Sequence, residues 1–358
     1  MVSKRTDTVG VVGERAVLRR VLAQFTPSES AVVGPGDDAA VLSLGSDMVV
    51  TSDTMIEGSD FRLAWHAAEH SGAADETPGF ELGYKLAATN LSDVAAMGAR
   101  PIGLTVSLAC PQDTRVRLLV GIARGLNAAC EQLAPGCGVV GGDLATSPVL
   151  TAAITAFGEL DGHTPVLRSG AQPGDTIAYA GQLGLAGIGL DLLFRHATAP
   201  DGSALSGGLA KLRAKHPEAI GAQLAPLPPI RAGNEAQRAG ASAMLDVSDG
   251  LSLDAARIAA ASGVTMSLDA SKLLRAFGQQ GGQHVTVADM LTGGEDHGLL
   301  ATFSSDAELP PAFHPIGEVV EARDDGSQVL LDGAPFEPRG WDPYGTLPPG
   351  AGQPQQNA

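Results

Sequence analysis

The sequence predicts a mixed α/β (α+β) protein built from two domains. Its 358 residues suffice for two domains of ordinary size, and 44% of them are hydrophobic, which is enough for two cores. Helical and strand-like hydrophobic patterns occur on both sides of a turn-rich segment at residues 161–175. We therefore expect an N-terminal domain over residues 1–160, a C-terminal domain over 161–345 and a disordered, Pro/Gly/Gln-rich tail over 346–358.

Charge and cysteine content exclude several classes of protein. The net charge of −17 argues against a nucleic-acid or anionic-membrane binder, although a nucleotide can still bind through Mg²⁺. Cys110, Cys130 and Cys137 form no CxxC pair, which favours a reducing cytoplasm over a disulfide framework or a zinc knuckle. The polar N-terminus and the lack of a long apolar run predict neither a signal peptide nor a membrane span, so we expect a cytoplasmic protein.

The N-terminal half alternates between helical and strand-like patterns. Apolar residues recur at helical spacing over 14–25, and two β-like runs within 31–44 flank a Gly-Pro-Gly turn and an acidic pair. Residues 61–80 are polar and Ala-rich, which predicts a solvated loop. We further expect a strand over 48–54, a buried helix over 86–101, a strand over 103–109, a helix over 113–133 and a strand over 149–157.

The C-terminal half repeats the combination of strand, turn and helix. This order is predicted over 176–190 and over 243–261, and a Gly-Gly-Glu-Asp turn precedes a strand within 291–300. Residues 200–230 are interrupted by Gly and Pro and are expected to wrap the surface. No G-x-G-x-x-G and no G-x-x-x-x-G-K-[ST] occurs, so neither a dinucleotide fingerprint nor a Walker loop is present.

One acidic residue stands out in the predicted central helix. Apolar residues cover most of this helix, so it should be packed on most sides, yet it carries Asp93. A carboxylate in apolar surroundings is costly unless it is paired, hydrogen-bonded or bound to a metal, which makes Asp93 a candidate ligand. The alternative is a helix cap or a solvated residue at a kink.

Other aspartates share this character, because they lie in short acidic stretches near predicted strand ends or turns. If they converge, their mutual repulsion requires cations, and carboxylate oxygens select Mg²⁺ or Mn²⁺ over zinc. Magnesium ions held in this way can bind a polyphosphate without a Walker loop, which indicates phosphoryl transfer. The alternative is scattered aspartates at turns. The candidate residues are Asp38, Asp53, Asp93, Asp143, Asp246 and Asp249.

A second metal pattern occurs in the polar stretch at 61–80. His66, Glu69 and His70 match the H-x-x-E-H pattern of inverted zinc peptidases and would share a face on a helix. The surrounding sequence is typical of a loop and offers no obvious third ligand, so we favour a solvated loop.

Seven ordered motifs resemble those of the thiamine-monophosphate kinase family, which belongs to an ATP-dependent superfamily with aminoimidazole ribonucleotide synthetases. The motifs are GDDAAVL, TSDTMIEGSDF, GYKLAATNLSDVAAMGARP, GGDLATSP, LRSGAQPGD, AMLDVSDGLSLD and LTGGEDHGL, and the resemblance runs from about residue 13 to 344. It implies a two-domain aminoimidazole ribonucleotide synthetase-like fold, in which the N-terminal sheets of two copies pair in a homodimer and the C-terminal α/β domain covers the nucleotide.

The resemblance also implies an activity and a set of site residues. The γ-phosphoryl group of ATP would move onto thiamine monophosphate, with several Mg²⁺ ions and no covalent phosphoenzyme. The magnesium ligands would be Asp38, Thr51, Ser52, Asp53, Asp93, Asp143, Asp246 and Asp249, of which Asp53, Asp93, Asp143 and Asp249 are expected to be catalytic. Contacts with ATP would come from Gly142, Asp143, Arg168 and Ser248, and contacts with thiamine phosphate from Glu295 and Trp341.

The chain departs from the family pattern at two places. The family usually has a histidine that contacts substrate where this chain has Asp60, and the loop at 65–79 is longer than usual. An anionic Asp60 would repel an anionic substrate. Two alternatives follow: a sister-family enzyme that acts on another substrate, or a catalytically silent nucleotide-binding protein. A selenophosphate synthetase is disfavoured, because the N-terminal segment has no cysteine.

Overall fold

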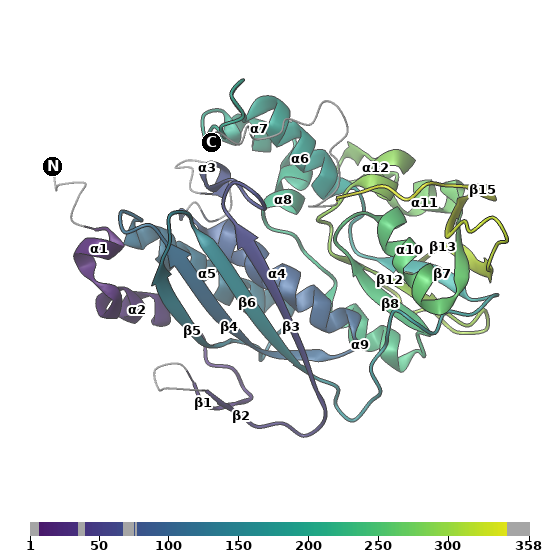
Figure 1. Ribbon diagram of the computed structural model, residues 1–358, viewed down its shortest axis with the longest axis horizontal. Coiled ribbons are helices and arrows are strands. Elements are labelled where there is room, and N and C mark those ends of the chain that lie inside the picture. Colours follow the sequence, from purple (N-terminus) through teal and green to yellow (C-terminus); the bar gives the residue numbers. More distant parts are fainter. Residues whose placement is uncertain (1–6, 35–39, 67–74, 76, 342–358) are drawn as a thin grey trace.

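The computed structural model describes residues 7–34, 40–66, 75 and 77–341. Two β-sheets with helices packed between and around them form the molecule, and one helix of the N-terminal half lies between the sheets (Figure 1). The predicted junction at 161–175 contains no helix or strand and connects a strand of the first sheet to a strand of the second. The division into two domains stays a prediction, because one hydrophobic core includes residues from both halves.

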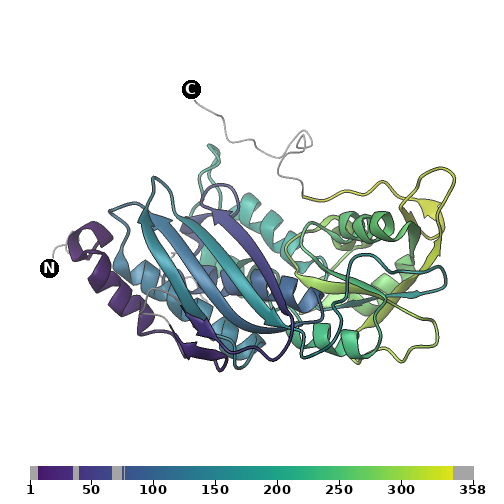
Figure 2. The ribbon, with the colours of Figure 1, turned by 60° about the horizontal axis from the view of Figure 1, so that its bottom comes forward.

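The first sheet has four strands and is open on one face. Its order is β3-β6-β4-β5, and only the β4–β5 pair is parallel. Helices α4 (Phe80–Ala96) and α5 (Val116–Leu133) cover the other face (Figure 2). The strands are β3 (Met48–Ile56), β4 (Arg100–Cys110), β5 (Val139–Thr146) and β6 (Thr151–Glu159).

Smaller elements surround this sheet. Helices α1 (Val9–Val12) and α2 (Glu14–Leu22) lie at the N-terminal end beside α5, and β1 (Ala31–Val33) pairs with β2 (Val41–Leu42). The predicted acidic pair, which includes Asp38, falls between these two strands and lies outside the described residues.

The second sheet has seven strands and is buried on both faces. Along β7, Ala178 and Ala180 belong to the core shared with α4, whereas Ile177 and Tyr179 belong to the core beneath α10. Its order is β15-β14-β9-β13-β7-β12-β8. The strands are β7 (Thr176–Ala180), β8 (Ala243–Val247), β9 (Val264–Leu268), β12 (Gly298–Phe303), β13 (His314–Glu321), β14 (Val329–Leu331) and β15 (Ala334–Pro335).

Helices and one small ribbon complete the C-terminal half. They are α6 (Leu185–His196), α7 (Leu209–Lys215), α8 (Pro217–Leu224), α9 (Ile230–Arg238), α10 (Leu251–Ser262), α11 (Ala270–Phe277), α12 (Val287–Thr292), β10 (Gln279–Gln280) and β11 (Gln283–His284). No helix in the described part of the chain is long and apolar enough to cross a membrane.

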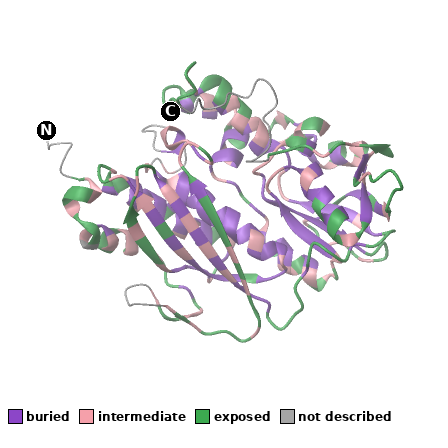
Figure 3. Ribbon diagram, in the orientation of Figure 1, coloured by how far each residue is buried: buried purple, intermediate pink, exposed green. Residues whose placement is uncertain are grey.

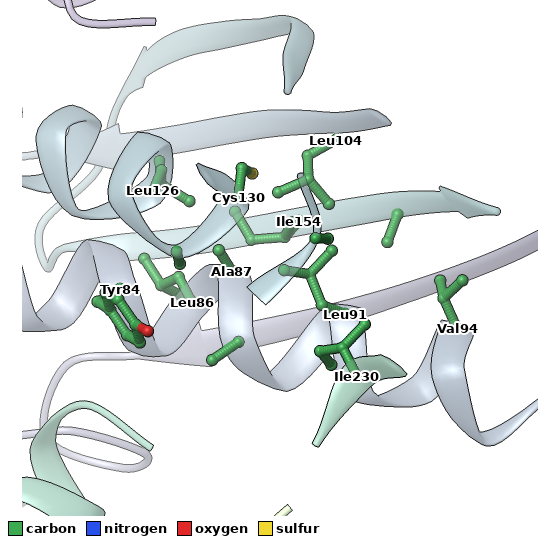
Figure 4. Close-up of a cluster of buried hydrophobic side chains, with 14 of the residues drawn as sticks. Tyr84, Leu86, Ala87, Leu91, Val94, Leu104, Leu126, Cys130, Ile154 and Ile230 are labelled. Carbon is green, nitrogen blue, oxygen red and sulfur yellow. The ribbon is translucent and has the colours of Figure 1, made fainter. Parts of the chain in front are cut away.

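Helix α4 is the buried centre of the structure. Its Leu86, Ala87, Leu91 and Val94 pack against side chains of α5, β4, β6 and α9 (Figure 4), and the helix is buried over nearly its whole length (Figure 3). The expectation of a packed helix is therefore confirmed, but its bounds were wrong. The helix spans 80–96 instead of 86–101, because residues 100 and 101 already belong to β4.

Two segments contain helices that the sequence pattern did not predict. Within 200–230, α7 and α8 bury Leu209, Ile220 and Leu224, a helical spacing that the surrounding prolines and glycines obscure. Within 61–80, the short helix α3 (Leu63–His66) buries Trp65 among α6, α7 and α8, and its indole Nε1 donates to the Ala197 carbonyl at 2.9 Å. The described part of that stretch is therefore not solvated, because its tryptophan anchors it.

Glycines bring α4 and α5 into backbone contact. A Cβ added to Gly83 would lie 1.9 Å from the Ile122 carbonyl oxygen, and one added to Gly125 would lie 1.9 Å from the Phe80 carbonyl oxygen. Backbone atoms cannot yield as a flexible side chain can, so any larger residue would push the two helices apart.

We predict that Gly83→Ala lowers the free energy of unfolding by about 2 kcal/mol, because overpacking outweighs the gain in helix propensity. The matched control is Gly221→Ala in α8, where an added Cβ meets nothing within 4 Å. This control should be stabilising by about 0.5–1 kcal/mol. Urea denaturation followed by circular dichroism measures both changes, and equal stability of Gly83→Ala and the wild type would contradict close helix contact.

Candidate active site

Polar residues on one face of α4 contact the C-terminal half. Glu81, Lys85 and Ser92 are spaced by four and seven residues, which places them on the same side of a helix. Glu81 pairs with Arg213 of α7 at 2.8 Å, and the Ser92 hydroxyl donates to Asp246 of β8 at 3.0 Å. The polar side chains of this buried helix thus find their partners in the C-terminal half of the chain.

Asp93 lies beside this face and contacts the first sheet. The Thr51 hydroxyl donates to the Asp93 carboxylate at 3.0 Å. Side chains alternate along β3, so Asp53 shares the α4 face with Thr51 and with the core residue Met55. Asp53 lies within β3 and not at a strand end as predicted. Three of the predicted metal ligands therefore lie near one another on the covered face of this sheet.

Asp246, at β8 of the second sheet, lies beside Ser92 and Asp93 of α4. Its carboxylate accepts the Ser92 hydroxyl and lies 3.3 Å from Nδ1 of His297. Asp246 also lies close enough to Asp93 to raise its pKa by charge repulsion. The helix, β3 and β8 thus meet at two neighbouring carboxylates, the half-buried Asp93 and the buried Asp246, whose oxygens are ligands of the kind that Mg²⁺ prefers.

The turn between α12 and β12 carries an acidic side chain, Glu295, and a basic one, His297. Glu295 and His297 have φ angles of 73° and 51°, which non-glycine residues rarely adopt, and such strained residues cluster at functional sites. Oε2 of Glu295 lies 2.7 Å from Nζ of Lys85 and 3.7 Å from Nε2 of His297. This turn therefore connects the predicted substrate contact Glu295 with α4.

The electrostatic balance of the cluster follows from burial and pairing. Burial and the Asp246 charge raise the pKa of Asp93 to about 7. Burial alone would lower the pKa of His297, but the hydrogen bond to Asp246 and the negative charge of the nearby Glu295 raise it to about 10. Burial acts to raise the pKa of Asp246, and the hydrogen bond to His297 outweighs it and lowers this pKa. His297 is thus protonated at neutral pH, while Asp93 titrates there.

A second acidic group follows β8. The Asp249 carboxylate pairs with Arg257 of α10 at 2.6 Å, and the Asp249 N–H donates to the buried Asp254 at 3.1 Å. The Ser248 carbonyl accepts the Glu295 N–H at 2.7 Å, and the Asp249 carbonyl accepts the Trp341 N–H at 2.9 Å. The structure therefore gathers the predicted residues Ser248, Asp249, Glu295 and Trp341 around one turn.

Other predicted residues lie apart from this cluster. The Ser52 hydroxyl donates to the Ile154 carbonyl at 3.0 Å and accepts from Thr155 at 3.2 Å, on the open face of the first sheet. Leu144 packs against the core, so the preceding Asp143 lies on the open face too. Edge strand β5 is three strands, roughly 14 Å, from β3.

Two predicted ATP contacts also lie at a distance from the carboxylate pair. Gly142 lies on β5, where an added Cβ would come within 2.0 Å of the Val106 carbonyl oxygen. The Arg168 carbonyl accepts from Ser262 at the last residue of α10, whereas Asp249 precedes the first turn of that helix. The helix has 12 residues, which separates its ends by about 18 Å. The binding roles of Gly142 and Arg168 stay predictions.

Asp60 has a structural partner. Its carboxylate accepts the Ile56 N–H at 2.8 Å and so closes the turn after β3. Burial is the main cause of the raised pKa of Asp53, and the negative charge of Asp60 raises this pKa further. The charge of Asp60 therefore acts on a residue of the candidate site. Asp60 thus lies close enough to act on Asp53, and its expected place beside the substrate stays a prediction.

The zinc alternative remains untested. His66 is buried at the end of α3, and burial, helped by the charges of Lys85 and Arg213, lowers its pKa to about 3. Glu69 and His70 lie outside the described residues. Within the part of the chain that the structure describes, no three His, Cys, Asp or Glu side chains form a group arranged to hold a metal ion.

Sequence reasoning missed Lys85 and His297. Lys85 is 1% exposed, and His297 bridges Asp246 and Glu295. The argument that singled out Asp93 applies equally to Lys85, since a lysine in a packed helix also needs a partner. Nothing in the sequence signalled His297 beyond its place in a glycine-rich turn.

We predict that Asp93→Asn stabilises the metal-free protein at neutral pH. The raised pKa means that native Asp93 holds a proton which the unfolded chain releases above about pH 4, so wild-type stability falls until about pH 7. The asparagine variant lacks this loss. Urea denaturation in EDTA from pH 4 to 8 measures the free energy of unfolding of both proteins. The variant should be the more stable, and its advantage should grow up to about pH 7. An advantage that does not change with pH would contradict the raised pKa.

Comparisons with known proteins agree with the family motifs. Residues 36–160 match the family described as AIR synthase related protein, N-terminal domain. The thiamine-monophosphate kinase of Mycobacterium tuberculosis is 33% identical over 347 residues, covering 95% of this chain and 94% of the relative. That of Corynebacterium glutamicum is 34% identical over 342 residues, covering 93% of this chain and 94% of the relative.

A solved structure extends the agreement to the fold. AaThiL complexed with AMPPCP and TMP is 28% identical with a TM-score of 0.66, over 92% of this chain and 96% of that chain. The expected aminoimidazole ribonucleotide synthetase-like fold is thereby confirmed, and the relatives are phosphotransferases that act on a phosphate acceptor. On sequence and fold together, the chain belongs to the thiamine-monophosphate kinase family.

Proposed function

We propose that the chain transfers the γ-phosphoryl group of ATP to thiamine monophosphate, giving thiamine diphosphate and ADP. Several Mg²⁺ ions would take part, held by Asp53, Asp93, Asp246 and Asp249. The observation that carries the metal part is the proximity of two carboxylates from different halves of the chain, the half-buried Asp93 and the buried Asp246. Two carboxylates about 4 Å apart repel by about 4 kcal/mol at an effective dielectric of 20. A divalent cation removes this repulsion, and all-oxygen donors favour Mg²⁺.

Each group of residues has a proposed role. Asp53, Asp93, Asp246 and Asp249 would bind magnesium beside the nucleotide phosphates, and the metal would supply charge neutralisation. Glu295 and Trp341 would contact the thiamine phosphate, with the tryptophan ring available to stack on its cationic rings. Because both reactants are anionic, the protein contributes chiefly position and compensation of charge, without a covalent intermediate. Further roles rest on the resemblance: Asp38, Thr51, Ser52 and Asp143 for magnesium, and Gly142, Asp143, Arg168 and Ser248 for ATP.

The open face of the first sheet supports a homodimer. Met48, Val50 and Ile56 on β3 are 46%, 52% and 40% exposed, and nearby Val149 is 41% exposed. A second copy that covers this apolar face would also lie over Ser52 and Asp143. The free, buried thiols of Cys110, Cys130 and Cys137 are consistent with a cytoplasmic enzyme.

The activity is tested by ADP release with ATP, Mg²⁺ and thiamine monophosphate. Wild-type protein should release ADP only when thiamine monophosphate is present, and Asp93→Asn should lower kcat at least about a hundredfold because a metal ligand is lost. The matched control is Asp306→Asn, which neutralises an exposed aspartate elsewhere and should leave kcat unchanged. ATP binding without thiamine-dependent turnover would instead indicate a silent nucleotide-binding protein, and turnover with a different acceptor a sister-family enzyme.

Replacement of Asp60 by asparagine separates its charge from its turn contact. The amide oxygen can still accept the Ile56 N–H, so the turn is kept while the negative charge is removed. We expect the KM for thiamine monophosphate to fall by about fivefold, the equivalent of about 1 kcal/mol of relieved repulsion. Asp60→His should change KM in the same direction. A higher KM in both variants would mean that Asp60 acts through the turn alone.

A further inference from the structure

Two buried ion pairs connect α4 to the C-terminal half, one helical turn apart. Glu81 pairs with Arg213 at 2.8 Å, and Lys85 pairs with Glu295 at 2.7 Å. The first pair joins helices α4 and α7. The second ends on a residue expected to contact substrate. The two pairs share their chemistry but differ in what lies at their ends and in the exposure of the residue from the C-terminal half.

The Lys85 ammonium is buried and contacts two partners. The side chain is 1% exposed, and Nζ also donates to the Gln223 backbone carbonyl at 3.0 Å. An isolated buried ammonium is costly, so the lysine requires the carboxylate of Glu295. Because Lys85 projects from a helix packed on most sides, its ammonium marks a well-fixed point in the molecule.

Glu295, in contrast, belongs to a strained turn and is only partly covered. Its φ is 73°, and its N–H donates to the Ser248 carbonyl at 2.7 Å. Oε2, the oxygen that faces Lys85, is buried, while 31% of the side chain remains exposed. The carboxylate is therefore held at Oε2, while part of the Glu295 side chain stays accessible.

We propose that Lys85 is a positioning residue, which fixes the Glu295 carboxylate so that its free side can receive the cationic part of the thiamine phosphate. This inference rests on the proposed function. Lys85 itself does not touch the substrate. Without the ammonium, Oε2 of Glu295 keeps the more distant contact with His297 at 3.7 Å but loses the close contact with Lys85, and the glutamate rotates away from the position that binding requires.

Calorimetric titration of metal-loaded protein with thiamine monophosphate and, separately, with AMPPCP tests the role of Lys85. Lys85→Met should raise the Kd for thiamine monophosphate by about tenfold, a usual cost of losing a supporting contact at a ligand site. The Kd for AMPPCP should stay within about twofold, and Lys85→Arg, which keeps the charge, should recover most of the affinity. Loss of both affinities together would overturn the proposal.

The matched control is Arg213→Met, which breaks the neighbouring ion pair on the same face of α4. Both variants should melt at a lower temperature than the wild type, but only Lys85→Met should weaken binding of thiamine monophosphate. If Arg213→Met weakens it equally, contact between the halves is the cause and Lys85 has no specific role.

A double-mutant cycle covers the case in which Lys85→Met fails to fold. Lys85→Gln keeps a donor for the Gln223 carbonyl, and Glu295→Gln removes the other charge of the pair. Each single variant should lose affinity for thiamine monophosphate, and the double variant should lose little more than Glu295→Gln alone. Additive losses would contradict the proposal. If the wild type itself does not bind thiamine monophosphate, the proposed function fails, whereas wild-type binding with undiminished affinity in Lys85→Gln refutes only the positioning role.

Discussion

Compensation of charge on a buried helix is the constraint on which this structure depends. Helix α4 lies between two sheets, yet it carries Glu81, Lys85 and Asp93, each of which would be unstable alone in such surroundings. Arg213 and Glu295 of the C-terminal half pair with the first two. The two halves are therefore joined by hydrophobic contact and also by the need of each buried charge for its partner.

The same constraint locates the site. The Asp93 carboxylate accepts a hydrogen bond from the neutral Thr51 hydroxyl and lies close to a second carboxylate, Asp246 of the opposite half. His297 compensates Asp246 and Glu295, which leaves Asp93 with a raised pKa. A carboxylate whose pKa is raised by burial and by a second carboxylate marks a place where a cation can bind, and this is the chemistry that phosphoryl transfer requires.

The two faces of the first sheet serve different purposes. Thr51 and Asp53 share the covered face with α4, while Ser52 and Asp143 share the open face with exposed apolar residues of β3. The period of two along a strand makes this separation unavoidable, because neighbouring side chains point to opposite sides. Ligands taken from consecutive positions of one motif therefore do not form a single cluster within one copy of the chain.

The sequence by itself determined the mixed α/β class, the burial of α4 and the anomaly of Asp93, because hydrophobic periodicity and an isolated charge are local properties. The ordered motifs added the family. Prolines and glycines concealed α7 and α8, and the extent of α4 was misjudged by about one and a half turns at its start. Only the tertiary structure decided that Asp246 meets Asp93, that Asp143 lies on the other face, and that Lys85 and His297 belong to the site. These relations join residues about 50 to 210 positions apart in the sequence, and packing between sheets creates them, which no local pattern records.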